Sequence, residues 1–182
     1  AELVFFSPLQ DKKLPEEVDG MILSGGYPEL HAKTLSENHS MREAIRKAIE
    51  DGVPCIAECG GFLYLHRELE GQDGVFYPMA GVLDAKAYRT DRLGRFGYIT
   101  LTAEVDQLLG KTGMEIRGHE FHYWDSEQCG TSFHAKKPVG KREWDCVNSS
   151  ESLYAGFPHL FFWSNPQAAY EFLKKCEEYH GC

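Results

Sequence analysis

One stretch of sequence decides the fold of this chain: Val53-Pro54-Cys55-Ile56-Ala57-Glu58-Cys59-Gly60-Gly61-Phe62-Leu63-Tyr64-Leu65. Apolar residues run up to Ala57, and a second apolar run begins after Gly61, with Cys59 between them. This pattern is typical of a nucleophile elbow, a sharp strand-to-helix turn that needs small residues because two backbones pass close together. Backbone N–H groups at the start of the helix favour a thiolate and, later, an oxyanion. We therefore predict that Cys59 is a catalytic nucleophile.

Length and composition predict one globular domain over residues 1–182. A formal net charge of −9 leaves no excess of Lys and Arg to neutralise phosphates, which argues against a nucleic-acid partner. No apolar run approaches the roughly 18 residues of a membrane span, and no signal peptide is visible, so we expect a cytoplasmic protein without a membrane partner. The chain starts at Ala1, directly before a strand-like run, and we interpret it as an N-terminally truncated piece of a longer protein.

The chain contains six cysteines, and their spacing indicates neither a metal site nor a disulfide framework. No C-x-x-C pair occurs, so zinc and redox sites both lack their usual spacing. We therefore expect no metal site. We interpret the cysteines other than Cys59 as structural or incidental thiols in a reducing cytosol; they stand at positions 55, 129, 146, 176 and 182.

Strand-like and helix-like segments alternate in the first 70 residues. We expect strands over residues 2–7, 18–23 and 53–57 and helices over residues 40–50 and 60–70. A capping box of Ser40 and Glu43 is expected to open the first helix. Such alternation implies a mainly parallel sheet that is covered on both faces and binds ligands beyond the carboxyl ends of its strands. Gly25-Gly26 and Cys59 both fall there, and the paired glycines form either a plain tight turn or a backbone surface for a ligand.

The second half of the chain has a different character. Short strand candidates lie over residues 98–102, 115–118, 133–135, 145–147 and 152–157. We expect a β-rich, partly antiparallel insertion with hairpin tips near Gly94 and Gly140. Asn165 and Pro166 are expected to cap a last helix, whose predicted inner face is Ala169, Phe172, Leu173 and Cys176.

Cys59 needs a proton acceptor, because a thiol attacks well only as a thiolate. His159 is a polar residue inside an apolar run at a predicted strand end. A histidine in that position is either a satisfied core residue or a base, and the unpaired Cys59 favours the base. Four other histidines are interpreted as solvated surface residues; these are His31, His39, His66 and His180.

Four motifs resemble those of one family. They are Gly25-Gly26-Tyr27-Pro28-Glu29-Leu30, Ala57-Glu58-Cys59-Gly60-Gly61-Phe62-Leu63-Tyr64-Leu65, Thr90-Asp91-Arg92-Leu93-Gly94-Arg95-Phe96-Gly97-Tyr98 and Gly118-His119-Glu120-Phe121-His122-Tyr123. Together they resemble the C-terminal glutamine amidotransferase domain of the cobyrinic acid a,c-diamide synthase family. The motifs follow the family's order, and the resemblance covers nearly the whole chain.

The resemblance implies a fold and a site. The fold is a three-layer α/β/α arrangement around a mainly parallel twisted sheet of the class I glutamine amidotransferase (flavodoxin-like) type. Cys59 matches the cysteine that attacks the carboxamide of glutamine to give a γ-glutamyl thioester and ammonia, and His159 matches the histidine base. Three glycines are placed to hold the oxyanion through backbone N–H groups; these are Gly25, Gly26 and Gly60. Glu120 and His122 are expected either to line the glutamine pocket, to form a docking face or to be structural.

The resemblance also implies a partner. In such synthases the ammonia amidates the a- and c-carboxylates of a corrin ring during cobalamin biosynthesis, and an N-terminal P-loop domain activates them with ATP and Mg²⁺. This chain contains no G-x-x-x-x-G-K-[ST] sequence, so we expect no cofactor here and assign ATP and Mg²⁺ to a synthetase domain outside it. Three arginines have two possible interpretations; these are Arg89, Arg92 and Arg95. One is a basic patch on which the polycarboxylate acceptor or the synthetase domain docks, and the other is a solvated turn.

One departure from the wider amidotransferase pattern concerns the histidine's partner. Many class I amidotransferases place a glutamate two residues after the catalytic histidine, but this chain has Phe161 there. The cobyrinate branch lacks that glutamate as well. Glu120 or a backbone carbonyl is a candidate for orienting the imidazole of His159.

Other functions stay open at this point. The same half-reaction serves a nickel-sirohydrochlorin a,c-diamide synthase or a cobyric acid synthase, although the Gly-Gly-Tyr-Pro-Glu loop argues against the latter. A non-catalytic interaction domain is a different class. A cysteine hydrolase of the dienelactone type would need an acidic triad member, for which Glu120 or Asp125 is available.

Overall fold

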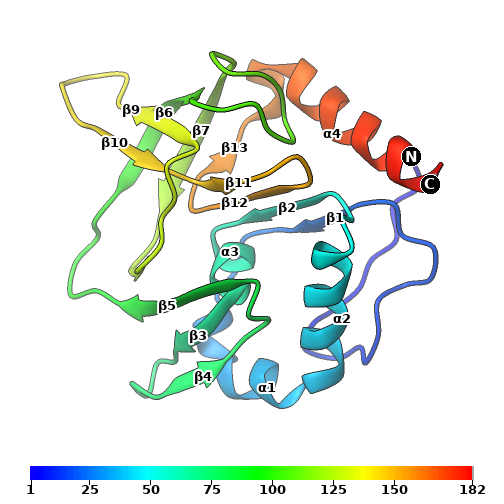
Figure 1. The fold of residues 1–182 in the computed structure, drawn as a ribbon. Coiled ribbons are helices and arrows are strands. Elements are labelled where there is room, and N and C mark those ends of the chain that lie inside the picture. Colours follow the sequence, from blue (N-terminus) through cyan, green and yellow to red (C-terminus); the bar gives the residue numbers. More distant parts are fainter. Residues whose placement is uncertain (182) are drawn as a thin grey trace.

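The computed structural model describes residues 1–181 and is organised around a four-stranded central sheet (Figure 1). Its strand order is β1 (Met21–Leu23), β2 (Cys55–Glu58), β12 (Leu153–Gly156) and β11 (Asn148–Ser149). The first three strands run parallel, and β11 runs antiparallel to β12. The carboxyl ends of the three parallel strands therefore meet at one edge of the sheet. The Gly25-Gly26 loop, Cys59 and His159 all follow these ends.

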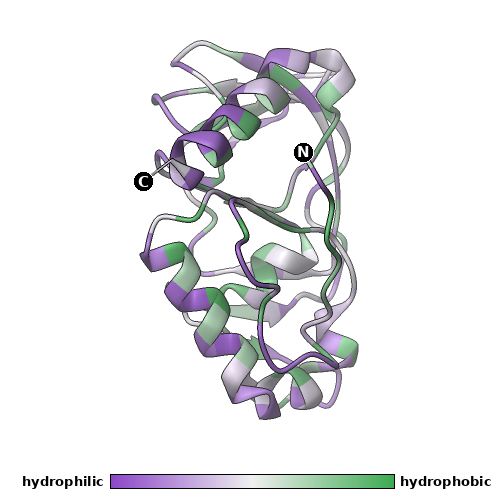
Figure 2. Ribbon diagram, turned by 90° about the vertical axis from the view of Figure 1, so that its right-hand side faces the viewer, coloured by the Kyte–Doolittle hydropathy of each residue, from purple (hydrophilic) through white to green (hydrophobic). Residues whose placement is uncertain are grey.

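Alternate residues of the central strands enter two separate hydrophobic cores. Cys55 and Ala57 of β2 belong to one core, whereas Ile56 belongs to the other. Helices α2 (His39–Glu50) and α3 (Gly60–Tyr64) pack on the first side, after a short helix α1 (Ala32–Glu37). Helix α4 (Pro166–His180) contributes Ala168 and Phe172 to the second core. The period of two along each strand thus produces the layered arrangement that Figures 1 and 2 show.

Two further sheets form the β-rich insertion. A five-stranded antiparallel sheet has the order β10 (Glu143–Cys146), β9 (Phe133–Lys136), β6 (Phe96–Ala103), β7 (Glu115–Phe121) and β13 (His159–Leu160). A four-stranded mixed sheet has the order β4 (Phe76–Pro78), β3 (His66–Glu70), β5 (Leu83–Arg89) and β8 (Trp124–Ser126). Two short 3₁₀ helices cover Pro28–Leu30 and Phe162–Ser164. Strand β13 pairs with β7, so the insertion lies directly against the segment that carries His159.

The α/β class, the parallel central sheet and the β-rich insertion are confirmed, but the expected helix over residues 60–70 is wrong in its second half. Helix α3 ends at Tyr64, and strand β3 begins at His66. Residues 66–70 contain one apolar residue, Leu69, so periodicity alone does not define their structure, and pairing with β4 and β5 makes them a strand. The expected strand over residues 2–7 is also wrong, because this segment has no strand partner and Phe5 is 91% exposed.

Helix boundaries differ from the sequence expectation in detail. Helix α2 begins at His39 with Asn38 in the N-cap position, so Ser40 lies inside the helix and the predicted capping box is wrong. The side chain of Asn38 instead donates to the carbonyls of Pro8 and Asp11, which ties down the N-terminal loop. On α2 the buried residues are Met41, Ile45 and Ile49.

The last helix begins where the sequence predicts, but one of the two expected hairpins is absent. Asn165 and Pro166 begin α4 as predicted, but its buried face is Ala168 and Phe172, whereas Leu173 is 48% exposed. Gly140 lies in the β9–β10 hairpin as expected. Gly94 does not form a hairpin tip, because it links β5 to β6 and these strands belong to different sheets. No helix in residues 1–181 is both long and apolar enough to cross a membrane.

Candidate active site

Cys59 stands at the sharp turn between β2 and α3, in a strained backbone conformation. Its φ and ψ angles are 48° and −101°, and a positive φ at a non-glycine residue costs about 1–3 kcal/mol. The turn is fixed at both ends, because the N–H of Cys59 donates to the carbonyl of Gly156 (2.8 Å) and its carbonyl accepts from the N–H of Leu63 (2.9 Å). The predicted elbow is therefore confirmed. Its Sγ lies 4.0 Å from the carbonyl oxygen of Phe121.

The glycines after Cys59 are required by close backbone contacts. A Cβ atom at Gly61 would lie 2.0 Å from the carbonyl oxygen of Leu23, at the end of β1. A Cβ atom at Gly60 would lie 2.7 Å from the carbonyl oxygen of Gly26. The elbow thus packs directly on the Gly25-Gly26 loop, and this close approach is possible only without side chains.

His159 lies beside Cys59 on the first residue of β13. The neighbouring Cys59 side chain raises the pKa of His159 to about 10, with a second contribution from the carboxylate of Glu58, although partial burial opposes the shift. A Cβ atom at Gly25 would lie only 2.4 Å from Cε1 of the imidazole, so Gly25 makes the room that the ring occupies. The structure therefore brings together Cys59, His159 and the glycine loop that the sequence singled out, while their chemical roles stay predictions.

Glu58 is a site residue that the sequence reasoning missed. Its Oε2 lies 3.6 Å from Nδ1 of His159, and its Oε1 accepts a hydrogen bond from the N–H of Leu160 (2.9 Å). The signal was present in the sequence, because Glu58 ends β2 directly before Cys59, at the same sheet edge as His159. The position that holds a glutamate in many amidotransferases carries Phe161, which is 54% exposed.

Glu120 and His122 lie beneath the site rather than at its surface. Glu120 is fully buried and accepts from the indole N–H of Trp144 (3.3 Å), and its Oε2 lies 3.2 Å from Nε2 of His122. The other ring nitrogen of His122 bonds to the carbonyl of Trp124 (2.6 Å), and the ring stacks on Phe157 at 3.7 Å. Glu120 is thus engaged away from His159, and the hypothesis that it orients the imidazole is wrong. A role of Glu120 and His122 in binding glutamine stays a prediction.

The three arginines of the predicted basic patch do not act as one surface. Arg89 and Arg92 are exposed. Arg95 turns inward, where a guanidinium nitrogen lies 3.3 Å from Sγ of Cys129 and 3.8 Å from a carboxylate oxygen of Asp125. Asp125 therefore does not serve as the acidic triad member that a dienelactone-type hydrolase would need.

One of the histidines interpreted as a surface residue is buried. His66 is 0% exposed, with its ring nitrogens 2.9 Å from the carbonyl of Phe62 and 2.6 Å from the hydroxyl of Ser126. Burial lowers the pKa of His66 to about 4. The interpretation failed because His66 opens β3 instead of continuing a surface helix. The other three are exposed as expected; these are His31, His39 and His180.

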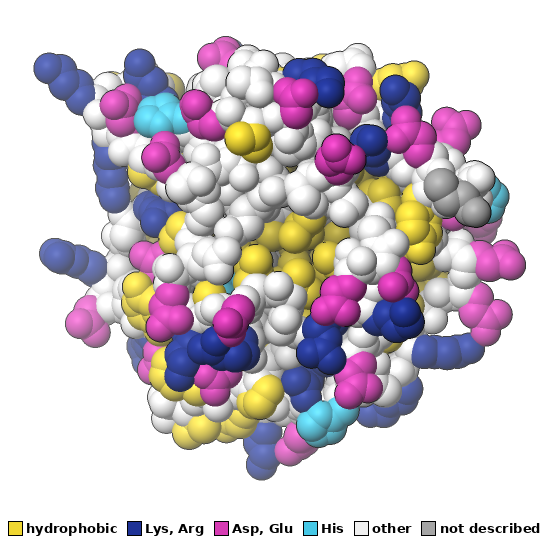
Figure 3. All heavy atoms as spheres, in the orientation of Figure 1, with side chains coloured by type: hydrophobic (Ala, Val, Ile, Leu, Met, Phe, Trp, Pro, Cys, Tyr) yellow, Lys and Arg dark blue, Asp and Glu magenta, His cyan; other side chains and the backbone are white. Residues whose placement is uncertain are grey.

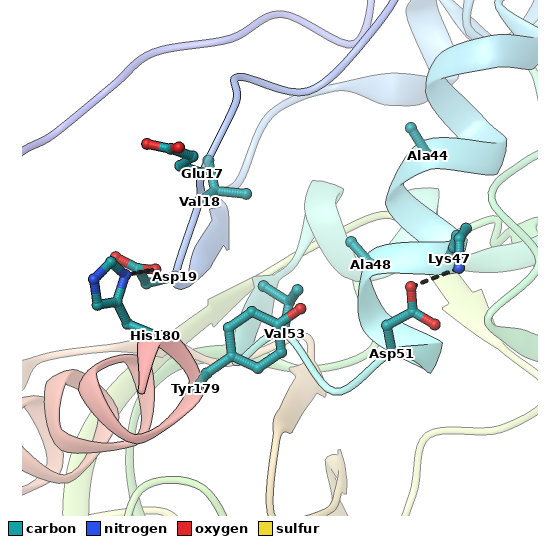
Figure 4. Close-up of a pocket in the computed structure, with 10 residues that line it drawn as sticks. All are labelled: Glu17, Val18, Asp19, Ala44, Lys47, Ala48, Asp51, Val53, Tyr179 and His180. Atoms are coloured by element: carbon teal, nitrogen blue, oxygen red, sulfur yellow. Dashed lines mark hydrogen bonds and ion pairs between the residues drawn. The ribbon is translucent and has the colours of Figure 1, made fainter. Parts of the chain in front are cut away.

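An open hollow lies elsewhere on the molecule, between α2 and α4 (Figures 3 and 4). Its lining includes Ala44, Ala48 and Val53, and ion pairs of Lys47 with Asp51 and of His180 with Asp19 lie at its sides. None of the predicted site residues lines it. Within residues 1–181 no group of three or more His, Cys, Asp or Glu side chains is arranged to hold a metal ion, and the five described cysteines are free. Cys182 lies outside the described residues.

Comparison with known proteins places this chain in a family. Residues 1–167 match the model of the CobB/CobQ-like glutamine amidotransferase domain. The chain belongs to this family. It is 38% identical over 181 residues to a cobyrinate a,c-diamide synthase of Caldanaerobacter subterraneus subsp. tengcongensis, covering 98% of this chain and 40% of that protein. It is 41% identical over 170 residues to the cobyrinate a,c-diamide synthase of Listeria innocua serovar 6a, covering 91% of this chain and 37% of that protein.

The likeness extends to solved structures. A crystal structure of a glutamine amidotransferase covers 89% of this chain and 81% of its own length, with a TM-score of 0.59 and 20% sequence identity. At that identity the likeness shows the fold alone, and it confirms the expected class I amidotransferase architecture. The family member described here spans only about 40% of the length of the curated synthases that it matches.

Proposed function

We propose that this chain is the glutaminase half of a cobyrinate a,c-diamide synthase, which hydrolyses glutamine and supplies ammonia to an acceptor carboxylate. The observation that carries this proposal is the strained Cys59 beside His159, packed against the Gly25-Gly26 loop. Family membership names the amide donor class. The names of the relatives, which are 38–41% identical, supply the acceptor.

In the first half of the reaction the proton of Cys59 rests on His159. Because the pKa of His159 is raised to about 10, the imidazolium persists at neutral pH, and its positive charge beside Sγ favours the thiolate as nucleophile. The thiolate attacks the carboxamide carbon of glutamine and forms a C–S bond. The C–N bond then breaks as the imidazolium gives its proton to the leaving nitrogen, which departs as ammonia.

In the second half a water molecule takes the place of ammonia. The neutral imidazole of His159 removes a proton from this water while its oxygen attacks the thioester carbon. The C–S bond breaks, glutamate is released, and the thiolate–imidazolium pair is restored. The same histidine thus acts first as an acid and then as a base.

Both halves pass through a tetrahedral intermediate with a negatively charged oxygen. We assign its stabilisation to backbone N–H groups of Gly60, at the start of α3, and of the Gly25-Gly26 loop. Contact between Gly60 and Gly26 supports this assignment, because it brings both segments to the same point beside Cys59. Each such donor contributes about 3 kcal/mol to transition-state stabilisation.

The partner in this proposal is a synthetase domain of the same enzyme. It would bind ATP and Mg²⁺ and activate the a- and c-carboxylates of a corrin ring in cobalamin biosynthesis, and no residue of this chain is assigned to that task. The length of the relatives supports a further domain. The acceptor of a nickel-sirohydrochlorin a,c-diamide synthase or of a cobyric acid synthase would require no change in this half of the enzyme.

The proposal is tested by trapping the nucleophile. The intact protein, together with its synthetase domain, is incubated with a diazo-ketone analogue of glutamine, and labelled peptides are identified by mass spectrometry. We expect one label on Cys59, none in a Cys59→Ser variant, and unchanged labelling in a Cys129→Ser control. A folded protein that stays unlabelled at Cys59 would contradict the glutaminase assignment.

A further inference from the structure

Glu58 is the last residue of β2, and its carboxylate lies beside His159. We infer that the Glu58 carboxylate is the positioning residue that holds the imidazole of His159, so that the working unit is Cys59, His159 and Glu58. This inference rests on the proposed glutaminase function of Cys59. It adds a third member, which is supplied by the strand before the nucleophile. The position two residues after the histidine holds Phe161, which has no carboxylate.

The carboxylate is held in place by the backbone. Glu58 is the last residue of β2, in register with Gly156 of β12, and its side chain is only 14% exposed. One oxygen accepts from the N–H of Leu160 at 2.9 Å, which fixes the rotamer of the side chain. The second oxygen is left 3.6 Å from Nδ1 of His159. Because Leu160 is the neighbour of His159, one carboxylate orients both the strand and the ring.

The other groups around the imidazole do not offer an alternative. Cys59 faces it from the elbow, and His119 is its cross-strand neighbour on β7. Gly25 contacts the ring from the β1 side and carries no side chain. Glu120 is engaged with His122 and Trp144, as described above. Glu58 is therefore the carboxylate that the structure places beside this ring.

The position of Glu58 defines what it does in the reaction. Nδ1 faces the carboxylate, so Nε2 is the nitrogen available for Sγ of Cys59 and for the leaving ammonia. A negative charge at 3.6 Å also favours the imidazolium, which is the form that protonates the leaving nitrogen. Glu58 itself makes and breaks no bond.

The first test is kinetic and uses the intact protein. In Glu58→Gln the amide oxygen keeps the hydrogen bond from Leu160 while the charge is lost. We expect kcat for glutamine hydrolysis to fall about 100-fold with KM changed less than about twofold, and the alkaline limb of the pH profile to move down by about one pH unit. Glu58→Asp keeps the charge and should restore the alkaline limb and part of kcat.

The matched control is Glu127→Gln. Glu127 also accepts a backbone N–H bond, from Lys86 at 2.9 Å, but it is exposed and directly follows β8, a strand of another sheet. We expect wild-type kinetics from this variant. Glu58→Gln with the same kcat and the same alkaline limb as Glu127→Gln would overturn the inference.

The second test needs no glutamine turnover. In protein labelled with ¹⁵N-histidine, the His159 signals are assigned by their loss in His159→Gln and followed between pH 6 and pH 11. We expect Nδ1 to keep its proton in the neutral ring of the wild type, and the midpoint of the His159 titration to fall by about one unit in Glu58→Gln. A neutral ring protonated on Nε2, or an unchanged midpoint, would overturn the inference. If the titrations of His159 give the expected results but the protein does not hydrolyse glutamine, the proposed function is refuted and the inference about Glu58 is not.

Discussion

At the scale of the residue, the site depends on the lack of a side chain at glycine positions as well as on the side chains of Cys59 and His159. Cys59 keeps a strained backbone because the turn around it is bonded at both ends, to Gly156 and Leu63. His159 reaches Cys59 because Gly25 has no side chain where the ring lies. A glycine that looks like a plain turn residue in the sequence therefore sets the position of the base.

Substitution of Gly25 by alanine tests this point. The new Cβ would lie 2.4 Å from Cε1 of His159, so the ring must swing away from Cys59. We expect kcat for glutamine hydrolysis to fall about 100-fold, because a displacement of about 1 Å is enough for such a loss. The melting temperature should change little, since the imidazole is partly exposed and free to move. Gly94→Ala, where a Cβ meets no atom within 4 Å, is the control, and wild-type kcat in Gly25→Ala would refute the argument.

At the scale of the element, the sequence was informative where one local rule acted alone. The elbow at Cys59 follows from small residues at fixed offsets, and the start of α4 follows from Asn165 and Pro166. Predictions from the sequence were wrong where tertiary contacts overrode a local pattern. Residues 66–70 form a strand because β4 and β5 pair with them, and Ser40 does not cap α2 because the helix begins one residue earlier.

The candidate site shows the same division. Cys59 and His159 were found because each has an unusual local context. Glu58 was missed, although it directly precedes Cys59 in the sequence, because its approach to His159 depends on the register between β2 and β12, which a single sequence does not reveal. His66 was misjudged for a related reason, since its burial depends on β8, which lies 60 residues further along the chain.

Gly61→Ala tests the contact between two elements. In an ordinary helix this change stabilises a protein by about 1 kcal/mol. Here the added Cβ would lie 2.0 Å from the backbone oxygen of Leu23, so α3 and β1 must separate. We expect the free energy of unfolding in urea to fall by about 2–3 kcal/mol, as in an overpacked core. A gain in stability like that of an ordinary helix would show that the two backbones are not in contact.

At the scale of the whole molecule, the insertion is built into the core rather than attached to it. Leu69 of β3, Leu83 of β5 and Trp124 of β8 belong to the same core as Ile45 of α2. His66 lies within this region and bonds to both α3 and β8 through its two ring nitrogens. The protonation of one buried side chain is therefore expected to affect the stability of the whole fold.

The dependence of stability on pH provides the test. Unfolded His66 takes up a proton near its ordinary pKa of 6.5, whereas folded His66 does so only near pH 4, because burial disfavours the charged ring. Since the unfolded state binds the extra proton, stability falls as the pH drops from 6.5 towards 4, by about 2 kcal/mol at pH 5 from this group. His159 has the opposite sign, and its contribution is lost only as the pH rises towards 10. In urea unfolding at pH 7 and pH 5, His66→Gln should lose less stability on acidification than the wild type by about this amount. Parallel losses in the two proteins would mean that His66 titrates normally and that its hydrogen bonds to Phe62 and Ser126 do not hold it neutral.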